Sequence, residues 1–243
     1  MKKIIIFLLL SSPLMAQNTL KVEYEQTYFN NSSNAEKKPA ILYVKSSESV
    51  YVLNPQIKGI IENEKKVDFI VKSFSLKEKK KSTKLHKLKK EKVYLDEFFQ
   101  DDYHYYIKDT WIDFKWEITK ETKKIGNYTC TKAISKNHRG RVWEAWFTTE
   151  ISVGDGPWKL QGLPGLILFA QDNSGGFSFI AKKIEKNTKD DTNNLFKVET
   201  LPRKTPQESY QVSLEIVRKF NEKLAEAGFE LKNTSVSPGI EVF

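Results

Sequence analysis

A regular alternation of apolar and charged side chains is the feature that most limits how this chain can fold. Between Ile112 and Ile118 every second residue is large and apolar, and the residues between them are charged. This pattern is typical of a strand with one buried face, and comparable segments recur along the first two thirds of the chain. The predicted strands cover residues 22–28, 41–44, 50–53, 67–74, 112–118, 128–134, 142–148, 166–170 and 177–184.

The connections between these segments are short and polar. Residues 172–176, Asp-Asn-Ser-Gly-Gly, predict a hairpin turn because glycine adopts positive φ without strain. A Ser-Ser-Glu-Ser turn at 46–49 separates two further strands. Since no alternation of strands with helices and no internal repeat is present, the pattern predicts an antiparallel meander.

One helix is clearly signalled near the carboxyl end. Thr205 and Glu208 form a capping box, Pro206 suits the first helical position, and Gly228 provides a stop. We therefore predict a mainly β protein of the α+β type: a twisted antiparallel sheet, a half-barrel-like meander, with one long C-terminal helix packed on it. The apolar stripe of that helix consists of Tyr210, Leu214, Val217, Phe220 and Leu224.

The first 16 residues are typical of a signal peptide, with Lys2 and Lys3 before a short apolar run. A retained anchor is the alternative, but the run is shorter than the roughly 20 residues that span a bilayer. We expect one exported domain over residues 17–243 without a later transmembrane segment, in the periplasm or at the outer membrane of a Gram-negative bacterium. Cys130 is the single cysteine, expected to be a buried hydrophobe and otherwise a reactive thiol or a bridge to another chain.

The net charge of +9 is concentrated in one segment, because residues 77–92 hold nine lysines and two glutamates. Without interleaved aromatics and arginines this run does not favour nucleic acid as a partner. We expect a solvated basic loop, with contact to anionic lipid or lipopolysaccharide phosphates as the alternative. The lysines of that alternative surface are Lys79, Lys80, Lys81, Lys84, Lys87, Lys89 and Lys90.

Catalytic and metal-binding patterns are weak. His86, His104 and His138 have no ligand spacing, so no metal and no cofactor is predicted. Asp101 and Asp102 beside His104 fit a solvated turn better than an ion site. The sequence also has no nucleophile elbow and no phosphate-binding loop.

Three carboxylates on neighbouring predicted strands offer the one route to acid–base chemistry. Asp113, Glu117 and Glu144 belong to these strands, and two of them facing each other would be typical of a hydrolase. Exposed positions on the polar side of a sheet explain the same residues, so the catalytic residues are left unassigned.

The five tryptophans lie between residues 111 and 158. Strand alternation places Trp143 and Phe147 on one face and Trp146 on the other, which indicates either core packing or a surface for a ligand or partner. The candidate binding residues are Trp143, Trp146, Gly156, Pro157 and Trp158.

Three segments in order, at 125–133, 140–148 and 156–168, resemble the GLPGLI family of bacterial envelope proteins. Phe147 departs from that pattern, in which a tyrosine follows the tryptophan. The resemblance implies an exported protein with no assigned reaction, and its spacing is also similar to that of envelope lipoprotein carriers. The defining motif is interpreted as a structural corner made by Gly162, Leu163, Pro164, Gly165, Leu166 and Ile167.

These observations favour a non-enzymatic envelope protein that binds an apolar ligand or lipid in a groove between sheet and helix. One alternative is a protein-interaction accessory of an outer-membrane assembly. The other is the hydrolase with paired carboxylates. The oligomeric state stays open.

Overall fold

The computed structural model describes residues 19–29, 35–54, 82–100, 102–137 and 140–226. The predicted signal peptide, the predicted strand at 67–74 and Gly228 lie outside the described residues.

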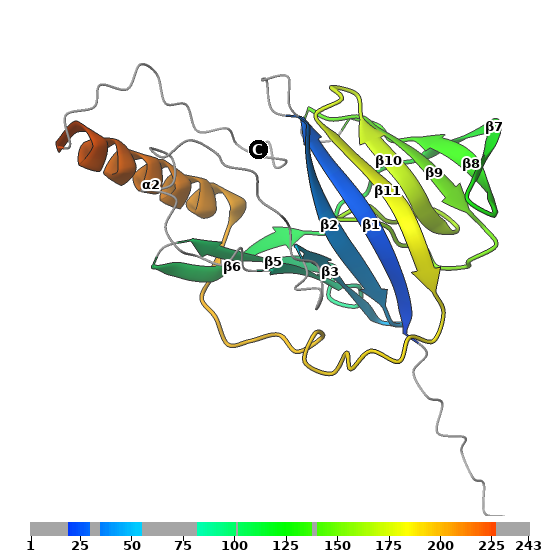
Figure 1. Ribbon diagram of the computed structural model, residues 1–243, viewed down its shortest axis with the longest axis horizontal. Coiled ribbons are helices and arrows are strands. Elements are labelled where there is room, and N and C mark those ends of the chain that lie inside the picture. The colour runs from blue at the N-terminus through cyan, green and yellow to red at the C-terminus, as the bar shows by residue number, and fades with distance from the viewer. Residues whose placement is uncertain (1–18, 30–34, 55–81, 101, 138–139, 227–243) are drawn as a thin grey trace, which may run out of the picture.

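The described strands form one sheet built from two meanders (Figure 1). In spatial order it runs β12-β6-β5-β4-β3-β2-β1-β11-β10-β9-β8-β7, so β1 to β6 and β7 to β11 each follow chain order. The meanders join where β1 pairs with β11, and every pairing is antiparallel except that of β12 with β6. The bounds are β1 Leu20–Phe29, β2 Ala35–Val44, β3 Glu48–Leu53, β4 Thr83–Leu88, β5 Val93–Gln100, β6 Tyr103–Thr110, β7 Glu117–Ile125, β8 Tyr128–Ile134, β9 Trp143–Thr148, β10 Leu166–Asp172, β11 Phe177–Glu185 and β12 Arg203–Lys204.

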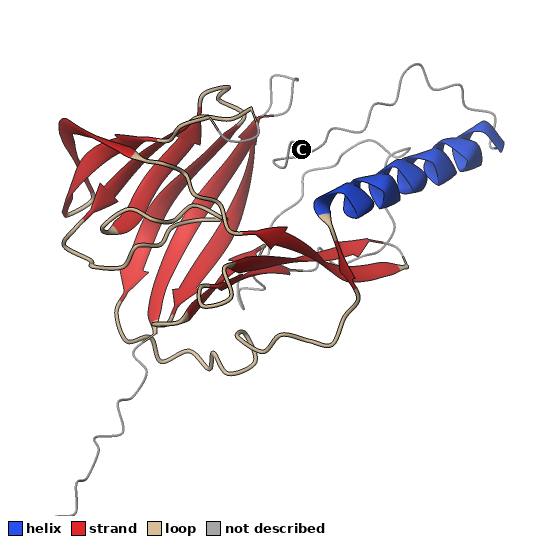
Figure 2. Cartoon of the chain, turned by 180° about the vertical axis from the view of Figure 1, so that it is seen from behind, coloured by secondary structure: helices blue, strands red, loops and turns tan. Residues whose placement is uncertain are grey.

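The sheet bends strongly, so that β3 to β6 turn away from the layer formed by β1, β2 and β7 to β11 (Figure 2). The connection between β9 and β10 covers the inner face, where Leu160, Leu163 and Trp143 join the main core. On the opposite face of β2 and β3, Phe196 packs against a smaller cluster that includes Tyr43 and Val50.

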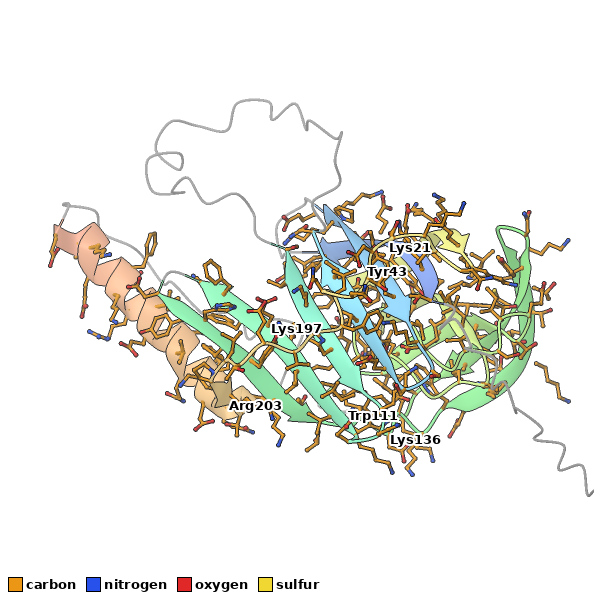
Figure 3. The ribbon with its side chains drawn as sticks, turned by 90° about the horizontal axis from the view of Figure 1, so that it is seen from below. Lys21, Tyr43, Trp111, Lys136, Lys197 and Arg203 are labelled. Carbon is orange, nitrogen blue, oxygen red and sulfur yellow. The ribbon has the colours of Figure 1, made fainter. Side chains whose placement is uncertain are left out.

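The segment that follows β11 is attached to this opposite face by polar contacts. The Asp190 carboxylate contacts Lys21 Nζ at 2.8 Å and accepts a hydrogen bond from Tyr43 Oη at 2.9 Å. Figure 3 shows Lys21 and Tyr43 near each other on β1 and β2, with Lys197 and Arg203 further along the segment. Both faces of the bent sheet are therefore partly covered by irregular chain.

The predicted fold class is confirmed, but β4, β5 and β6 were not predicted, and the strand predicted over residues 112–118 differs from the structure. Ile112 and Phe114 are buried and their charged neighbours are exposed, as the alternation predicts. Residues 111–116 are nevertheless not a strand, and β7 begins only at Glu117. Lys115 has a φ of 49°, a left-handed conformation that interrupts an extended strand.

The prediction of a loop over residues 77–92 is wrong for Thr83–Leu88, whereas residues 89–92 form a turn. Thr83–Leu88 form β4, which pairs with β3 and with β5, and a tight turn leads into β5. Leu85 and His86 are buried on opposite faces of β4. Lys87 is buried as well, so β4 is covered on both faces and its sequence shows no alternation that predicts a strand.

The helix α2 spans Pro206–Glu226 and has the predicted capping box. The Thr205 N–H donates to Glu208 Oε2 at 2.6 Å, and the Glu208 N–H donates to Thr205 Oγ1 at 3.2 Å. The main strand contacts of α2 are with β6 and β12 at one edge of the sheet, and Leu214 and Phe220 stay exposed. The predicted groove between helix and sheet near Trp146 is wrong, because β9 lies far from that edge in the strand order.

Within the described ranges, the structure has no helix with the length and apolar character needed to cross a membrane.

Candidate functional site

The connection between β9 and β10, residues 149–165, lies tightly against the sheet because of its glycines. A Cβ on Gly165 would come within 2.1 Å of the Thr148 carbonyl oxygen, and one on Gly156 within 2.8 Å of Ile167 Cβ. Gly162 has a φ of +92°, which glycine adopts without strain. The GLPGLI-like motif is thus a corner that presses this connection onto the inner face.

A buried ion pair joins the connection to β4. Lys87 is fully buried, and its Nζ donates to Asp155 Oδ1 and to the Gly156 carbonyl oxygen, both at 2.7 Å. It also donates to the Leu160 carbonyl oxygen at 3.2 Å. On the other carboxylate oxygen, Lys89 Nζ contacts Asp155 Oδ2 at 3.0 Å. These contacts join the meander of β1 to β6 to the connection within the meander of β7 to β11.

The ionisation of Asp155 follows from this geometry. Burial alone would raise the pKa of its carboxyl, but the ammonium groups of Lys87 and Lys89 outweigh burial and lower the pKa to about 2. Burial also lowers the pKa of Lys87, and the Asp155 carboxylate opposes that shift. The three short contacts of the Lys87 ammonium indicate that the pair is ionised.

A second buried ammonium lies four residues further along the same connection. Lys159 Nζ contacts Asp109 Oδ2 on β6 at 3.1 Å, and both side chains are almost fully buried. Tyr94 Oη donates to the Lys159 carbonyl oxygen at 3.2 Å, and the Trp111 ring stacks on the Tyr94 ring at 4.8 Å. Trp158 precedes this lysine with a φ of 48°, an unusual conformation for a bulky residue.

Asp96 on β5 completes this group of charges. Tyr94 pairs with Asp109 across β5 and β6, so alternation places the side chain of Asp96 on the same face as those two residues. Burial raises the pKa of Asp96 to about 6, the Lys159 ammonium opposes that shift, and the carboxylates of Glu97 and Asp109 add to it. Asp96 is only partly buried, and among the described residues its carboxyl has no hydrogen-bond partner. We refer to Asp96, Asp109 and Lys159 as the Asp96 cluster.

The Asp96 cluster can exchange protons near neutral pH. A carboxyl with a pKa near 6 is present in both forms at that pH, which suits a general acid or base. The adjacent buried ammonium of Lys159 favours the ionised form of Asp96. Sequence reasoning missed these residues, because Asp96 and Asp109 stand in strands with no motif around them.

The predicted aromatic candidates are divided between the two faces of the sheet. Trp143 is buried in the core, with ring centroids 5.8 Å from Trp158 and 5.9 Å from Phe179. Pro157 accepts a backbone hydrogen bond from Leu160. Trp146 lies on the opposite face of β9, where Lys123 Nζ is 3.9 Å from its ring centroid.

The three candidate carboxylates of the hydrolase prediction each pair with a lysine. Asp113 pairs with Lys115, Glu117 pairs with Lys136 at 3.6 Å, and Glu144 pairs with Lys132 at 3.3 Å. Glu117 and Glu144 lie in one row on either side of Ile134, and their pairing stays a prediction; a different pair of carboxylates, Asp96 and Asp109, interacts in the Asp96 cluster.

The predicted basic surface is only partly described. Lys79, Lys80 and Lys81 lie outside the described residues, whereas Lys84 and Lys89 are partly buried and Lys90 is exposed. The prediction is wrong for Lys87, because its ammonium is buried against Asp155 and cannot reach a surface.

The remaining predictions concern the histidines, possible metal ligands and the single cysteine. His104 Nε2 lies 2.9 Å from Glu97 Oε1 on the neighbouring strand. Asp101 and His138 lie outside the described residues. In the part of the chain that the structure describes, no group of three or more histidine, cysteine, aspartate or glutamate residues could hold a metal ion. Cys130 is a buried free thiol, and burial raises its pKa to about 11.

Comparison with known proteins assigns the family. Residues 22–211 match the family described as the N-glycanase peptide, N-terminal domain, and the chain belongs to that family. No curated protein matches this chain. The match corrects the GLPGLI assignment, for which the comparisons give no support.

Two solved structures of PNGF-II share the fold. The structure in space group P21 has a TM-score of 0.54 and 19% identity, and the alignment covers 81% of this chain. The structure in space group C2 has a TM-score of 0.52, also at 19% identity, over 77% of this chain. The alignments span 33% and 31% of the PNGF-II chains, about a third of their length. The prediction of a non-enzymatic lipid-binding protein is wrong, because the family that matches the chain is described as an N-glycanase domain.

Proposed function

We propose that this chain acts on asparagine-linked glycoproteins, as a domain of the peptide N-glycanase type that hydrolyses the link between asparagine and glycan. The observation that carries the proposal is the family match over residues 22–211. The Asp96 cluster supports it, because hydrolysis of an amide needs a group that moves protons near neutral pH.

The chemistry assigns one role to each member of the cluster. Hydrolysis adds water to the asparagine side-chain carbonyl carbon and breaks its bond to the glycan nitrogen. Asp96, when ionised, takes a proton from the attacking water and returns it to the leaving nitrogen. Lys159, whose ammonium is fully buried, acts through Asp96 by favouring its ionised form. Asp109 holds Lys159 in place through its 3.1 Å contact.

The test is deglycosylation of a denatured glycoprotein by the full chain, read by mass spectrometry as conversion of asparagine to aspartate. The wild type is expected to convert its substrate, with a rate that changes around pH 6. Asp96→Asn is expected to lose at least a hundredfold in rate, as is usual when a general acid or base is removed. Asp113→Asn is the matched control, because that carboxylate is exposed and lies outside the cluster. Absence of conversion by the wild type, or equal rates for wild type and Asp96→Asn, refutes the hydrolytic role.

A second role is favoured by one observation. The match is to an N-terminal domain, and the chain aligns with about a third of PNGF-II, so the domain would hold the glycoprotein while another domain cuts it. In that case a column of the immobilised full chain is expected to retain an N-glycosylated protein and to let its deglycosylated form pass. The retained glycoprotein is expected to keep its glycan. Equal retention of both forms contradicts this role.

The location of the protein belongs to the same proposal. Lys2, Lys3 and the apolar run that follows support export, and the finer assignment is the periplasm or the outer membrane. Fractionation of cells producing the tagged full chain tests it, and recovery in the cytoplasm at full precursor mass contradicts export.

A further inference from the structure

The outer face of β7 to β10 carries aromatic rings that lie under lysines: Trp146 is 7% exposed, beneath Lys123 and, at 6.0 Å from its ring centroid, Lys132. The register pairs Trp146 with Lys132 on β8 and with Phe169 on β10, so these three side chains share one face. Lys123 Nζ lies 3.9 Å from the Trp146 ring centroid and 4.8 Å from that of Phe169. Among the described residues Lys123 contacts these rings and no carboxylate.

The charges beside these rings balance locally. Lys132 Nζ contacts Glu121 Oε1 at 3.2 Å and Glu144 Oε2 at 3.3 Å, and the Trp146 indole N–H donates to Glu144 Oε1 at 2.8 Å. Lys123 and Lys132 together offset Glu121 and Glu144, so this surface does not select an anion. Lys123, Lys132, Glu144, Trp146 and Phe169 are called the Trp146 face below.

A hollow continues the Trp146 face along the strands. Lys123 pairs with Cys130 and Ile125 with Tyr128, so alternation places Ile125 and Tyr128 on the face of Lys123, about 7 Å further along. These two residues and Leu168 line a hollow of about 250 Å³, rimmed by Asn127 and Lys182. Its volume lies just below the range of about 300–1,000 Å³ typical of small-molecule sites, so it admits one small ring system and no long acyl chain.

The geometry points to a neutral saccharide as the occupant of this face: a pair of N-acetylhexosamine rings, one in the hollow against Tyr128 and one over Trp146 in place of the Lys123 ammonium. The inference rests on the proposed function, since it names the part of a glycoprotein that the domain recognises. Aromatic rings offer a flat negative face to the C–H groups of a pyranose. The Asn127 amide, the Lys182 ammonium and Glu144 supply donors and an acceptor for hydroxyl and acetamido groups.

Displacing Lys123 is a small obstacle to binding. The ammonium is exposed, and its attraction to the ring at such a site corresponds to about a two- to fivefold change in a binding constant. Removing this lysine is therefore expected to strengthen saccharide binding, whereas removal of an ordinary hydrogen-bonding lysine would weaken it. That difference in sign distinguishes a lysine that covers the site from one that binds the ligand.

The experiment titrates the full chain with N,N′-diacetylchitobiose and follows calorimetry and tryptophan fluorescence. The wild type is expected to bind, Tyr128→Ala to bind about tenfold more weakly, and Lys123→Ala about two- to fivefold more tightly. Lys136→Ala is the matched control, because that lysine is exposed and lies beyond the Trp146 face. Trp146→Phe is expected to lose the fluorescence change and to keep measurable heat of binding.

Failure of the inference and failure of the proposed function give different results. No binding at millimolar disaccharide, unchanged affinity in Tyr128→Ala, or weaker binding in Lys123→Ala overturns the saccharide site. Equal affinity for a glycopeptide and its sugar-free form assigns the face to polypeptide and overturns it as well. If the disaccharide binds as expected and no glycoprotein is converted or retained, the site stands and the proposed function falls.

Discussion

Replacing Lys87 with methionine tests whether the buried ion pair between β4 and the β9–β10 connection stabilises the fold. Methionine keeps most of the apolar volume and removes the ammonium, which makes contacts at 2.7, 2.7 and 3.2 Å. Removing one partner of a buried pair typically costs about 3–5 kcal/mol, because the other charge stays buried. Lys89 still faces Asp155 Oδ2 at 3.0 Å, so we expect the lower part of this range, about 3–4 kcal/mol.

Urea unfolding at pH 7 measures the difference in free energy of unfolding, with circular dichroism to confirm that each variant is folded. Lys89→Met is the control, since its side chain is 26% exposed and it makes one contact with Asp155. It is expected to cost about 1 kcal/mol or less. The double variant with Asp155→Asn should show a coupling of about 2 kcal/mol or more between the two sites.

The pH dependence gives a second check on the same reasoning. Because Asp155 has a folded-state pKa of about 2, below its ordinary value of 3.8, its stabilisation is present above pH 4 and is lost as pH falls toward 2. The cost of Lys87→Met should shrink over that window. A cost below about 1 kcal/mol at pH 7 would refute the view that this pair holds the connection to the sheet.

Three further predictions concern stability. Asp96→Asn should raise the free energy of unfolding above pH 6 by up to about 3 kcal/mol and have no effect below pH 4, because a folded-state pKa of about 6 makes ionised Asp96 unfavourable; a destabilised variant at pH 7.5 in urea unfolding contradicts this. Gly165→Ala should lower the free energy of unfolding by more than about 3 kcal/mol, since its Cβ would overlap the Thr148 carbonyl. Gly126→Ala, with open space around it, should lower it by about 1 kcal/mol. Equal decreases in melting temperature for the two variants contradict this prediction. His86 is buried with a pKa of about 4, so stability should fall by up to about 3 kcal/mol as pH drops from 6.5 to 4, and His86→Phe should remove that slope.

The parts of the fold that were predicted correctly are those fixed by neighbouring residues. The capping box at Thr205 and the Asp-Asn-Ser-Gly-Gly hairpin depend on turn and cap chemistry within five residues. Lys115 shows the limit of this reasoning: burial alternates before it as predicted, but its left-handed backbone interrupts the extended chain, and Ile118 beyond it is 53% exposed. Periodicity reports which side chains are buried and not the backbone that buries them.

The site could not be predicted because its contacts are distant in sequence. Lys87 and Asp155 are 68 positions apart, and Lys159 and Asp109 are 50 apart. A lysine within a run of lysines gives no sign that it is the buried one. The family was missed for a related reason: the glycine-rich motif records a close approach to Thr148, which is a packing requirement and not a mark of activity.

The pairing of β1 with β11 governs how the chain reaches its native state. Lys21 lies opposite Glu185, so the amino-terminal strand keeps one edge open until nearly the whole domain has been synthesised. Each meander can form from strands that are neighbours in sequence. The pairing of β1 with β11, however, closes a loop of about 160 residues, and long loops of this kind slow folding. Until then, two unsatisfied strand edges are exposed to any other nascent chain. The junction that unites the two meanders is therefore also the step at which this protein is most vulnerable to aggregation.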